Sequence, residues 1–214
     1  AKPWIKGFTT NPTLMRKAGV LDYEAFARQF CDMVYPLPVS LEVFADELNE
    51  MDKQARIIAT WKDNIYVKIP ITNTETVSTV PLIQKLTADG VKINTTAVFT
   101  KEQIEGLRDA FSDRVPAIVS VFAGRIADAG QDPTEYVRYA VQRFQGKRNV
   151  EILWASPREI YNVVQAIECG AHIITVQNDL LPKLSSLGKE LSGFSLETVQ
   201  MFRNDALASE YDIR

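Results

Sequence analysis

The stretch Ile65-Tyr66-Val67-Lys68-Ile69-Pro70-Ile71 places one lysine in the middle of an apolar run. Such runs are typical of buried strands in parallel sheets, which are covered on both faces. A charged amine there costs free energy unless it is paired with an opposite charge or kept neutral. A neutral amine can attack a carbonyl and form a Schiff base, so Lys68 indicates covalent carbonyl chemistry. The alternative is a lysine on an edge strand whose amine reaches solvent.

Similar β-rich runs recur along the chain and alternate with stretches whose apolar residues recur every three or four positions. The expected strands are 5–10, 39–44, 65–71, 91–99, 117–122, 151–155 and 173–176. The expected helices are 22–35, 47–61, 76–88, 101–111, 133–144, 157–169 and 179–187, with a tail helix over 196–208 outside the repeat. Strict alternation predicts a parallel sheet with right-handed crossovers. Because no Pro-, Gly- or Ser-rich linker divides the chain, we expect one domain over residues 1–214.

Three of the expected helices carry start signals. Thr100 and Gln103 have the spacing of a capping box. Asp132 precedes Pro133, and Ser156 precedes Pro157, each proline standing at an expected first helical position. These signals predict helices that begin at Lys101, Pro133 and Pro157.

Polar residues recur where the expected strands end, which distinguishes two parallel architectures. They are Thr9, Thr10, Asn11, Glu42, Lys68, Asn94, Thr96, Ser120, Ser156, Gln177 and Asn178. A doubly wound open sheet gathers its site at one switch point, whereas a barrel gathers it from all strands at one mouth. The wide distribution favours a (β/α)₈ TIM barrel that is one unit short, followed by a C-terminal helix.

Composition excludes several classes of function. Among 214 residues, 46% are hydrophobic and the net charge is −3, so no basic surplus indicates a nucleic-acid partner. No apolar stretch is long enough to span a membrane. Cys31 and Cys169 do not have metal-ligand spacing and are expected to be small core residues, and the single histidine, His172, is expected to be structural.

Six short segments together resemble the transaldolase family of class I aldolases, which includes small transaldolases and fructose-6-phosphate aldolases. The segments are Gly7-Phe8-Thr9-Thr10-Asn11-Pro12-Thr13-Leu14, Ser40-Leu41-Glu42-Val43, Val67-Lys68-Ile69-Pro70-Ile71-Thr72, Asn94-Thr95-Thr96-Ala97-Val98-Phe99, Ser120-Val121-Phe122-Ala123-Gly124-Arg125-Ile126 and Ala155-Ser156-Pro157-Arg158. Each is short, but all six occur in the family's order at expected strand ends. The resemblance covers nearly the whole chain.

The resemblance implies a role for each matching residue. Lys68 would form the Schiff base with a ketose phosphate, and Glu42 would act in proton transfer through a water that Thr96 holds. Asn11 and Asn94 would bind substrate hydroxyls, Ser120 and Ser156 would line the substrate path, and Arg125 and Arg158 would bind the phosphate. For each residue a structural role is the alternative, such as a turn at Asn11, a strand former at Thr96, caps at Ser120 and Ser156, or solvated arginines. No metal or cofactor is implied.

Two positions distinguish the branches that this chain resembles. Transaldolases carry Glu at position 42 and Phe at position 122, as here, whereas fructose-6-phosphate aldolases usually carry Gln and Tyr. A tyrosine hydroxyl could help to protonate the enamine and release dihydroxyacetone, so Phe122 favours transfer to an acceptor aldehyde. The alternatives are aldol cleavage and a non-catalytic barrel that binds sugar phosphates. A deoxyribose-phosphate-type aldolase is disfavoured by the Thr-Thr-Asn-Pro segment.

The resemblance also implies a cytoplasmic enzyme of the pentose phosphate pathway and a homo-oligomer, whose contacts the tail over 196–208 could serve. In the family the lysine belongs to the fourth strand, yet 65–71 is the third expected here. We therefore expect the first strand to be missing from this sequence. Roughly 20 preceding residues would supply that strand and a short helix, with an aspartate near the strand's end.

Overall fold

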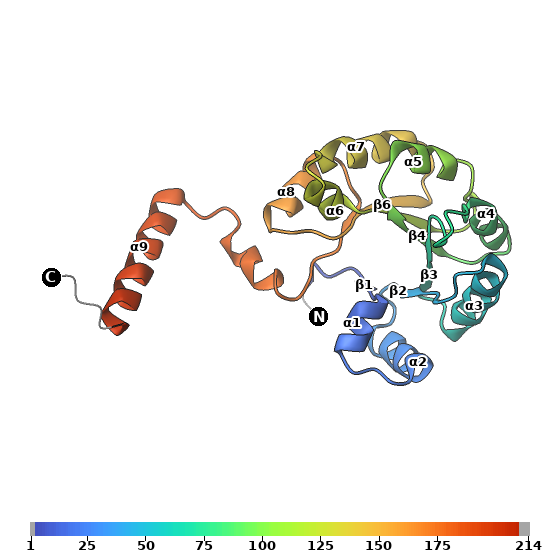
Figure 1. The fold of residues 1–214 in the computed structure, drawn as a ribbon, viewed down its shortest axis with the longest axis horizontal. Coiled ribbons are helices and arrows are strands. Elements are labelled where there is room, and N and C mark those ends of the chain that lie inside the picture. Colours follow the sequence, from blue (N-terminus) through green and yellow to red (C-terminus); the bar gives the residue numbers. More distant parts are fainter. Residues whose placement is uncertain (1–2, 210–214) are drawn as a thin grey trace. The chain divides into compact units, whose positions relative to one another are not determined.

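The computed structural model describes residues 3–209 and contains a parallel sheet whose strands follow one another in chain order (Figure 1). The strands are β1 (Phe8–Thr9), β2 (Val39–Glu42), β3 (Ile65–Pro70), β4 (Ile93–Val98), β5 (Ala117–Val121), β6 (Val150–Trp154) and β7 (Ile173–Ile174). Neighbouring strands are hydrogen-bonded from β1 through to β7. A doubly wound sheet has a point at which the strand order reverses, and the order here does not reverse. The doubly wound alternative is therefore excluded.

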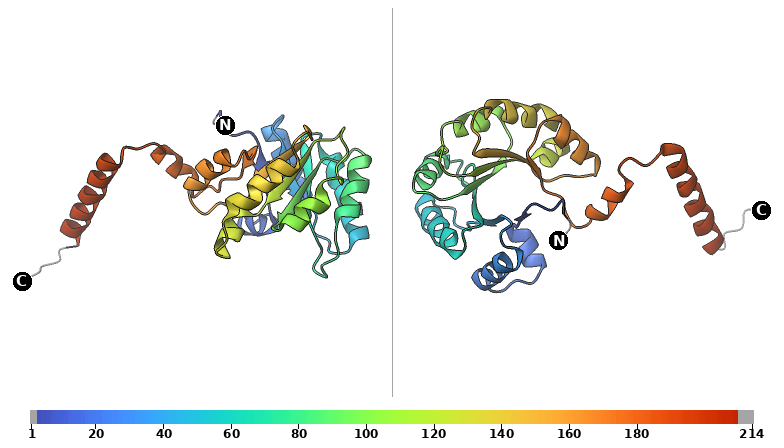
Figure 2. Two further views of the ribbon diagram at one scale, coloured as in Figure 1. Left: turned by 90° about the horizontal axis from the view of Figure 1, so that it is seen from above. Right: turned by 180° about the vertical axis from the view of Figure 1, so that it is seen from behind.

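Helices connect the strands and surround the curved sheet, as the two further views also show (Figure 2). They are α1 (Pro12–Lys17), α2 (Tyr23–Val34), α3 (Leu48–Trp61), α4 (Val80–Ala88), α5 (Lys101–Leu107), α6 (Ala123–Asp128), α7 (Pro133–Arg143) and α8 (Tyr161–Glu168). The curled parallel sheet with helices outside confirms the predicted α/β TIM-like barrel. The expectation of a strand upstream of Ala1 stays a prediction.

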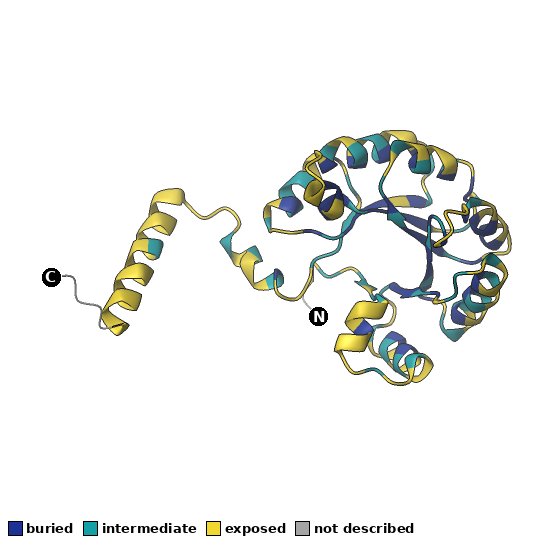
Figure 3. Ribbon diagram, in the orientation of Figure 1, coloured by how far each residue is buried: buried dark blue, intermediate teal, exposed yellow. Residues whose placement is uncertain are grey.

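The two faces of the sheet carry different residues because side chains alternate along each strand. Val67 and Ile69 on β3 point outward and pack with the helices in one large apolar core. Tyr66 points inward and packs in a separate cluster with Ile118, Leu153, Ala155, Phe122 and Ile173. Figure 3 shows the central strands β2 to β6 as mostly buried and the outer faces of the helices as exposed. The inner face is therefore partly apolar, and it also carries the polar residues described below.

The register of β4 shifts near its end. Its pairing with β5 is irregular between Thr95 and Val98, and Ala97 has a φ of 57°. A non-glycine residue in the left-handed region re-aims the strand locally. Thr96 and Val98 on either side of Ala97 are both buried, and Val98 packs in the large apolar core between the sheet and the helices, here called the outer core.

The chain divides into two compact units, residues 1–176 and 177–214. The first unit holds the barrel. The second holds a 3₁₀ helix, η1 (Leu181–Ser186), and α9 (Leu191–Ala208), which has no buried residue. The expectation that residues 1–214 form one domain stays a prediction, and this division into two compact units does not decide it.

Several expected boundaries were wrong. Short helices α1 and α6 were not expected, the segment expected as a helix over 179–187 contains only the 3₁₀ helix η1, and α9 begins before residue 196. The helix expected from Pro157 begins at Tyr161 instead. The Asn162 side chain accepts hydrogen bonds from the backbone of Arg158 and Glu159, which fixes a turn in place of the first helical turn.

Other expectations of local structure were confirmed. Thr100 and Gln103 form the capping box, and Asp132 caps α7 ahead of Pro133. Cys31 and Cys169 are buried free thiols. His172 Nδ1 accepts a hydrogen bond from the backbone of Ile152 at 3.0 Å, which ties β7 to β6. Within residues 3–209, none of the helices combines the length and the apolar character needed to cross a membrane.

Candidate functional site

The inner face of the sheet brings Glu42 and Lys68 together. The two residues are partners in the register of β2 and β3, and Lys68 is also the partner of Asn94 on β4. Since paired residues of adjacent strands point to the same face, all three side chains enter the barrel interior. The outward neighbours of Lys68, Val67 and Ile69, are fully buried in the core and anchor this strand.

The Lys68 amine is held by two oxygen acceptors. It lies 2.7 Å from the Thr10 carbonyl and 3.2 Å from Glu42 Oε2. The side chain of Lys68 is 10% exposed and that of Glu42 is 17% exposed. A buried ammonium and carboxylate each need such a partner, because an isolated buried charge is expensive. The pairing places a proton acceptor directly beside the amine.

Tyr23 of α2 fixes the end of β2 beside this pair. Its hydroxyl accepts a hydrogen bond from the Glu42 backbone N–H at 3.0 Å and donates to the Glu42 carbonyl at 3.4 Å. Burial raises the pKa of Tyr23, so the hydroxyl stays protonated. The ring packs edge-on against Phe44 and Trp61. Sequence reasoning missed Tyr23, since no motif connects it to Glu42.

A buried hydrogen-bond network centred on the Asn94 amide crosses the interior beside the lysine. Asn94 Nδ2 donates to Ser40 Oγ at 3.0 Å, and Ser120 Oγ donates to Asn94 Oδ1 at 2.7 Å. Each of these three residues is buried, and they come from β2, β4 and β5. The network orients the Asn94 amide. Ser40 was not predicted, although its alternation with Glu42 along β2 places it on the same face.

Thr96 and Phe122 lie further along the strands. Thr96 is buried and is the partner of Pro70 in the register of β4 with β3. Phe122 directly follows β5, and its ring lies 5.5 Å from that of Phe99. Phe122 packs with the inner cluster, whereas Phe99 packs against the outer core. The inner cluster therefore presents a ring without a hydroxyl near the ends of the strands.

A close backbone contact brings the start of α6, which carries Arg125, beside the loop that carries Arg158. A Cβ atom at Gly124 would lie 1.5 Å from the Ser156 carbonyl oxygen, so only glycine allows this approach. Ser156 has a φ of 62° and turns the chain after β6. Arg158 Nη1 donates to Ser156 Oγ at 3.0 Å. Arg125, on α6, lies with its guanidinium carbon 6.0 Å from the centre of the Phe122 ring.

Asn11 occupies a different setting from the interior residues. Its side-chain oxygen accepts a hydrogen bond from the Leu14 backbone at 2.9 Å and caps α1. Sequence reasoning weighed this kind of local turn role as the alternative for Asn11. Thr10 directly before it contributes the carbonyl that holds Lys68. The substrate-binding role of Asn11 stays a prediction.

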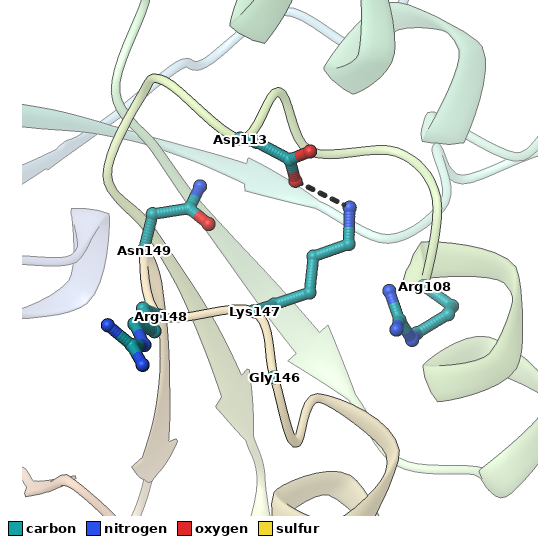
Figure 4. A pocket seen from close by; sticks show the side chains of 6 residues that line it. All are labelled: Arg108, Asp113, Gly146, Lys147, Arg148 and Asn149. Carbon is teal, nitrogen blue, oxygen red and sulfur yellow. Dashed lines mark hydrogen bonds and ion pairs between the residues drawn. The ribbon is translucent and has the colours of Figure 1, made fainter.

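A surface pocket of about 530 Å³ lies away from these residues (Figure 4). Its lining is Arg108, Asp113, Gly146, Lys147, Arg148 and Asn149. Asn149 immediately precedes β6, so the pocket lies at the amino-terminal end of the strands. Lys147 is paired with Asp113 at 2.9 Å. Barrel enzymes place their chemistry at the opposite, carboxyl-terminal end, which is where Glu42 and Phe122 lie.

The interior residues form a chemically coherent set. Transfer of a proton from the Lys68 ammonium to a base would free the amine lone pair for attack on a carbonyl. Glu42 is within hydrogen-bond reach to accept that proton. The oriented Asn94 amide can donate to or accept from a hydroxyl. The guanidinium groups of Arg125 and Arg158, which follow β5 and β6, are of the chemical type that binds phosphate through charge and paired hydrogen bonds.

Comparison with known proteins gives the family. The model of the Transaldolase/Fructose-6-phosphate aldolase family matches residues 1–212. This chain belongs to that family. It is 36% identical to "Probable transaldolase 2" of Listeria monocytogenes over 194 residues, covering 89% of this chain and 84% of the relative.

Two further relatives carry the same activity in their names. A "Probable transaldolase" of Dehalococcoides mccartyi is 36% identical over 181 residues, covering 84% of this chain and 80% of the relative. A "Probable transaldolase" of Streptococcus pyogenes is 34% identical over 184 residues, covering 85% of this chain and 80% of the relative. Membership of the family confirms the predicted resemblance, and the names of the relatives support an aldolase or transferase activity.

Proposed function

We propose that this chain is a transaldolase that works through a Schiff base at Lys68. It would transfer a dihydroxyacetone unit from fructose 6-phosphate or sedoheptulose 7-phosphate to an aldose phosphate. The observation that carries the proposal is the position of the Lys68 amine, which lies inside the barrel 3.2 Å from the Glu42 carboxylate. A solvated edge lysine, or a barrel that only binds sugar phosphates, would not require this placement.

The first half of the reaction cleaves the donor. Lys68 gives a proton to Glu42, directly or through water, and its amine attacks the C2 carbonyl of the ketose. Loss of water yields a protonated imine. Removal of the C4 hydroxyl proton then breaks the C3–C4 bond, its electron pair moves toward the iminium nitrogen, and an aldehyde leaves.

The second half builds the product. The three-carbon enamine on Lys68 attacks the carbonyl carbon of the acceptor aldehyde, whose oxygen takes up a proton. Water then hydrolyses the new imine and regenerates the amine. Because the Phe122 ring offers no hydroxyl, protonation of the enamine by this residue is not available, and the enamine persists until the acceptor arrives.

The remaining residues bind and orient the substrate in this proposal. Thr96 holds the water beside Glu42, Asn11 and Asn94 bind hydroxyls, Ser120 and Ser156 line the path, and Arg125 and Arg158 take the phosphate. The reaction uses neither a metal nor a cofactor. The pentose phosphate pathway and the cytoplasm remain expectations for its setting, as does assembly into a homo-oligomer.

Borohydride trapping tests the proposal. The protein is incubated with isotope-labelled fructose 6-phosphate and borohydride, and the labelled peptide is identified by mass spectrometry. We expect a three-carbon adduct on Lys68 and none in a Lys68→Met variant. Lys92→Met is the matched control, because Lys92 also donates to a backbone carbonyl, that of Asp63, but lies before β4 at the other end of the sheet.

Two results would count against the proposal. Label on another lysine would refute the assignment of Lys68, and the absence of any adduct would refute the Schiff base. An assay with erythrose 4-phosphate as acceptor then separates two activities. Release of free dihydroxyacetone in place of transfer would assign the chain to the fructose-6-phosphate aldolase branch.

A further inference from the structure

Asp128 is the last residue of α6 and lies one helical turn after Arg125. Its carboxylate accepts hydrogen bonds from Arg158 Nε at 2.9 and 3.0 Å, and a further, short one from Arg158 Nη2. The contact spans 30 residues of sequence and joins α6 to the loop after β6. A carboxylate at the carboxyl-terminal end of a helix is disfavoured by the helix dipole. The helix dipole therefore gives no reason for a carboxylate at this position.

The contacts of Arg158 with Asp128 and Ser156 leave one N–H donor of its guanidinium group available. Asp128 engages Nε and Nη2, and Ser156 accepts from Nη1 through its hydroxyl and its carbonyl oxygen. A guanidinium group has five N–H donors in a planar fork. With Nε, both N–H groups of Nη1 and one N–H of Nη2 engaged by Asp128 and Ser156, the second N–H of Nη2 retains donor capacity. The direction of this N–H is set by the contacts with the two residues.

Asp128 also moderates the charge of the arginine pair. Arg158 is hydrogen-bonded to Asp128, and the positive charge of Arg125 contributes to lowering the pKa of the Asp128 carboxyl, after the larger effect of the Arg158 hydrogen bond. Two guanidinium groups close together repel each other in the absence of an anion. The Asp128 carboxylate offsets one of these charges before substrate binds, which leaves one net positive charge among the three side chains.

We propose that Asp128 is a positioning residue for the substrate phosphate, which it serves by holding Arg158 through the Nε–Nη2 edge so that the remaining N–H of Nη2 faces the phosphate oxygens. This inference rests on the proposed function, in which Arg125 and Arg158 bind the phosphate. Asp128 itself does not touch the substrate. The opposite possibility is that Asp128 competes with the phosphate for Arg158, and the two possibilities predict opposite effects of removing its charge.

The test is Asp128→Asn, which keeps the size of the side chain and removes its charge. We expect the KM for fructose 6-phosphate to rise by about tenfold, with kcat changed by less than about twofold, because part of one charge-assisted contact is lost. Fructose, which lacks the phosphate, should show no such rise. Asp128→Glu keeps the charge and should recover part of the affinity.

Asp113→Asn is the matched control. Asp113 forms an ion pair with Lys147 at the other end of the barrel, and its substitution changes the net charge by the same amount. Its KM for fructose 6-phosphate should equal that of the wild type. Circular dichroism melting of each variant verifies folding. A merely structural role of Asp128 would lower Tm or kcat for both substrates without separating them.

Binding of inorganic phosphate supplies a readout that does not depend on turnover. The phosphate-induced rise in Tm should become smaller in Asp128→Asn. A larger rise, or a lower KM for fructose 6-phosphate, would identify Asp128 as a competitor and overturn the inference, and so would an unchanged value in both measurements.

Arg125→Lys and Arg158→Lys separate failure of this inference from failure of the proposed function. If both lysine variants weaken phosphate binding and Asp128→Asn does not, only the role of Asp128 is refuted. If neither lysine variant changes phosphate binding, the phosphate site itself is refuted, and the inference about Asp128 falls with it.

Discussion

The Glu42 carboxylate and the Lys68 amine face each other across β2 and β3, with Oε2 3.2 Å from Nζ. Glu42→Gln keeps the shape of this contact and removes the base. We expect kcat for transfer to fall by about 10²–10⁴-fold, the usual contribution of general acid–base catalysis. Steady-state kinetics measure the effect. Glu47→Gln, at an exposed position that caps α3 without a side-chain hydrogen bond, should leave kcat unchanged. Wild-type turnover in Glu42→Gln would contradict the role of Glu42.

Phe122→Tyr adds a hydroxyl on the inner side of the ring pair formed with Phe99. We expect free dihydroxyacetone to increase relative to the transfer product, because the hydroxyl can assist protonation of the enamine. Product analysis with and without an acceptor aldehyde measures the ratio. Phe99→Tyr places a hydroxyl on the neighbouring ring, which packs against the outer core, and should not alter the ratio. Equal ratios in both variants would show that Phe122 does not face the enamine.

Tyr23→Phe removes the hydroxyl that bonds the backbone of Glu42. The unpaired Glu42 N–H should lower the free energy of unfolding by about 1–3 kcal/mol, and the freed end of β2 should lower kcat. Urea denaturation and steady-state kinetics measure the two effects. Tyr35→Phe removes a hydroxyl that contacts Asp63 on the surface and should cost less than about 0.5 kcal/mol. Similar losses in the two variants would argue against a special role of Tyr23.

Gly124→Ala tests the contact that brings α6 beside the loop after β6. The added Cβ would clash with the Ser156 backbone, so we expect a loss of about 1–3 kcal/mol in the free energy of unfolding and weaker phosphate binding. Gly106→Ala is the control, because its Cβ would meet only Val80 Cγ2 at 3.9 Å. It should stabilise α5 by about 0.5–1 kcal/mol. A Gly124→Ala variant as stable as Gly106→Ala would show that the loop adapts.

We expect the stability of the first turn of α9 to depend on pH, because Glu190 caps this helix. Hydrogen bonds from the Ser192 hydroxyl and from the Ser192 and Gly193 amides lower the pKa of Glu190 from 4.5 to about 2. A depressed pKa means that the cap stabilises the helix above pH 4.5 and is lost as the pH falls through about 2.

Hydrogen exchange measures this cap directly. The protection factors of the Ser192 and Gly193 amides should fall across that pH range in the wild-type protein. They should not change with pH in Glu190→Gln, whose side chain does not titrate. The same decline in both proteins would show that another group controls the start of α9.

The central strands and the interior residues could be predicted from the sequence because both follow from the alternation of side chains along a strand. In β3, every second residue is apolar and packs outward, so the intervening Lys68 had to point inward. The same alternation places Glu42, Asn94 and Ser120 inside. The outermost strands β1 and β7 are shorter than expected, since an edge strand has only one hydrogen-bonded neighbour in the sheet to define its length.

Contacts that depend on loop conformation could not be predicted in the same way. Helix α6 has six residues, too few for an apolar period to show. The start of α8 is displaced by the Asn162 side chain, which competes with helical hydrogen bonding. Asp128 and Arg158 meet only because the barrel makes β5 and β6 neighbours and Gly124 permits close approach. The i, i+3 spacing of Arg125 and Asp128 on α6 was the available signal.

The alternation along β3 makes the protein respond very differently to substitution and to insertion. A substitution at Lys68 removes the amine and leaves Val67 and Ile69 in the core. Insertion of one residue after Ile65 would exchange the two faces for the rest of the strand. The Lys68 amine would then point outward among the helices, and the Val67 and Ile69 side chains would point inward toward the substrate. Activity and folding would then fail together. We therefore expect the loops between elements to tolerate insertions and deletions, whereas the central strands tolerate only substitutions.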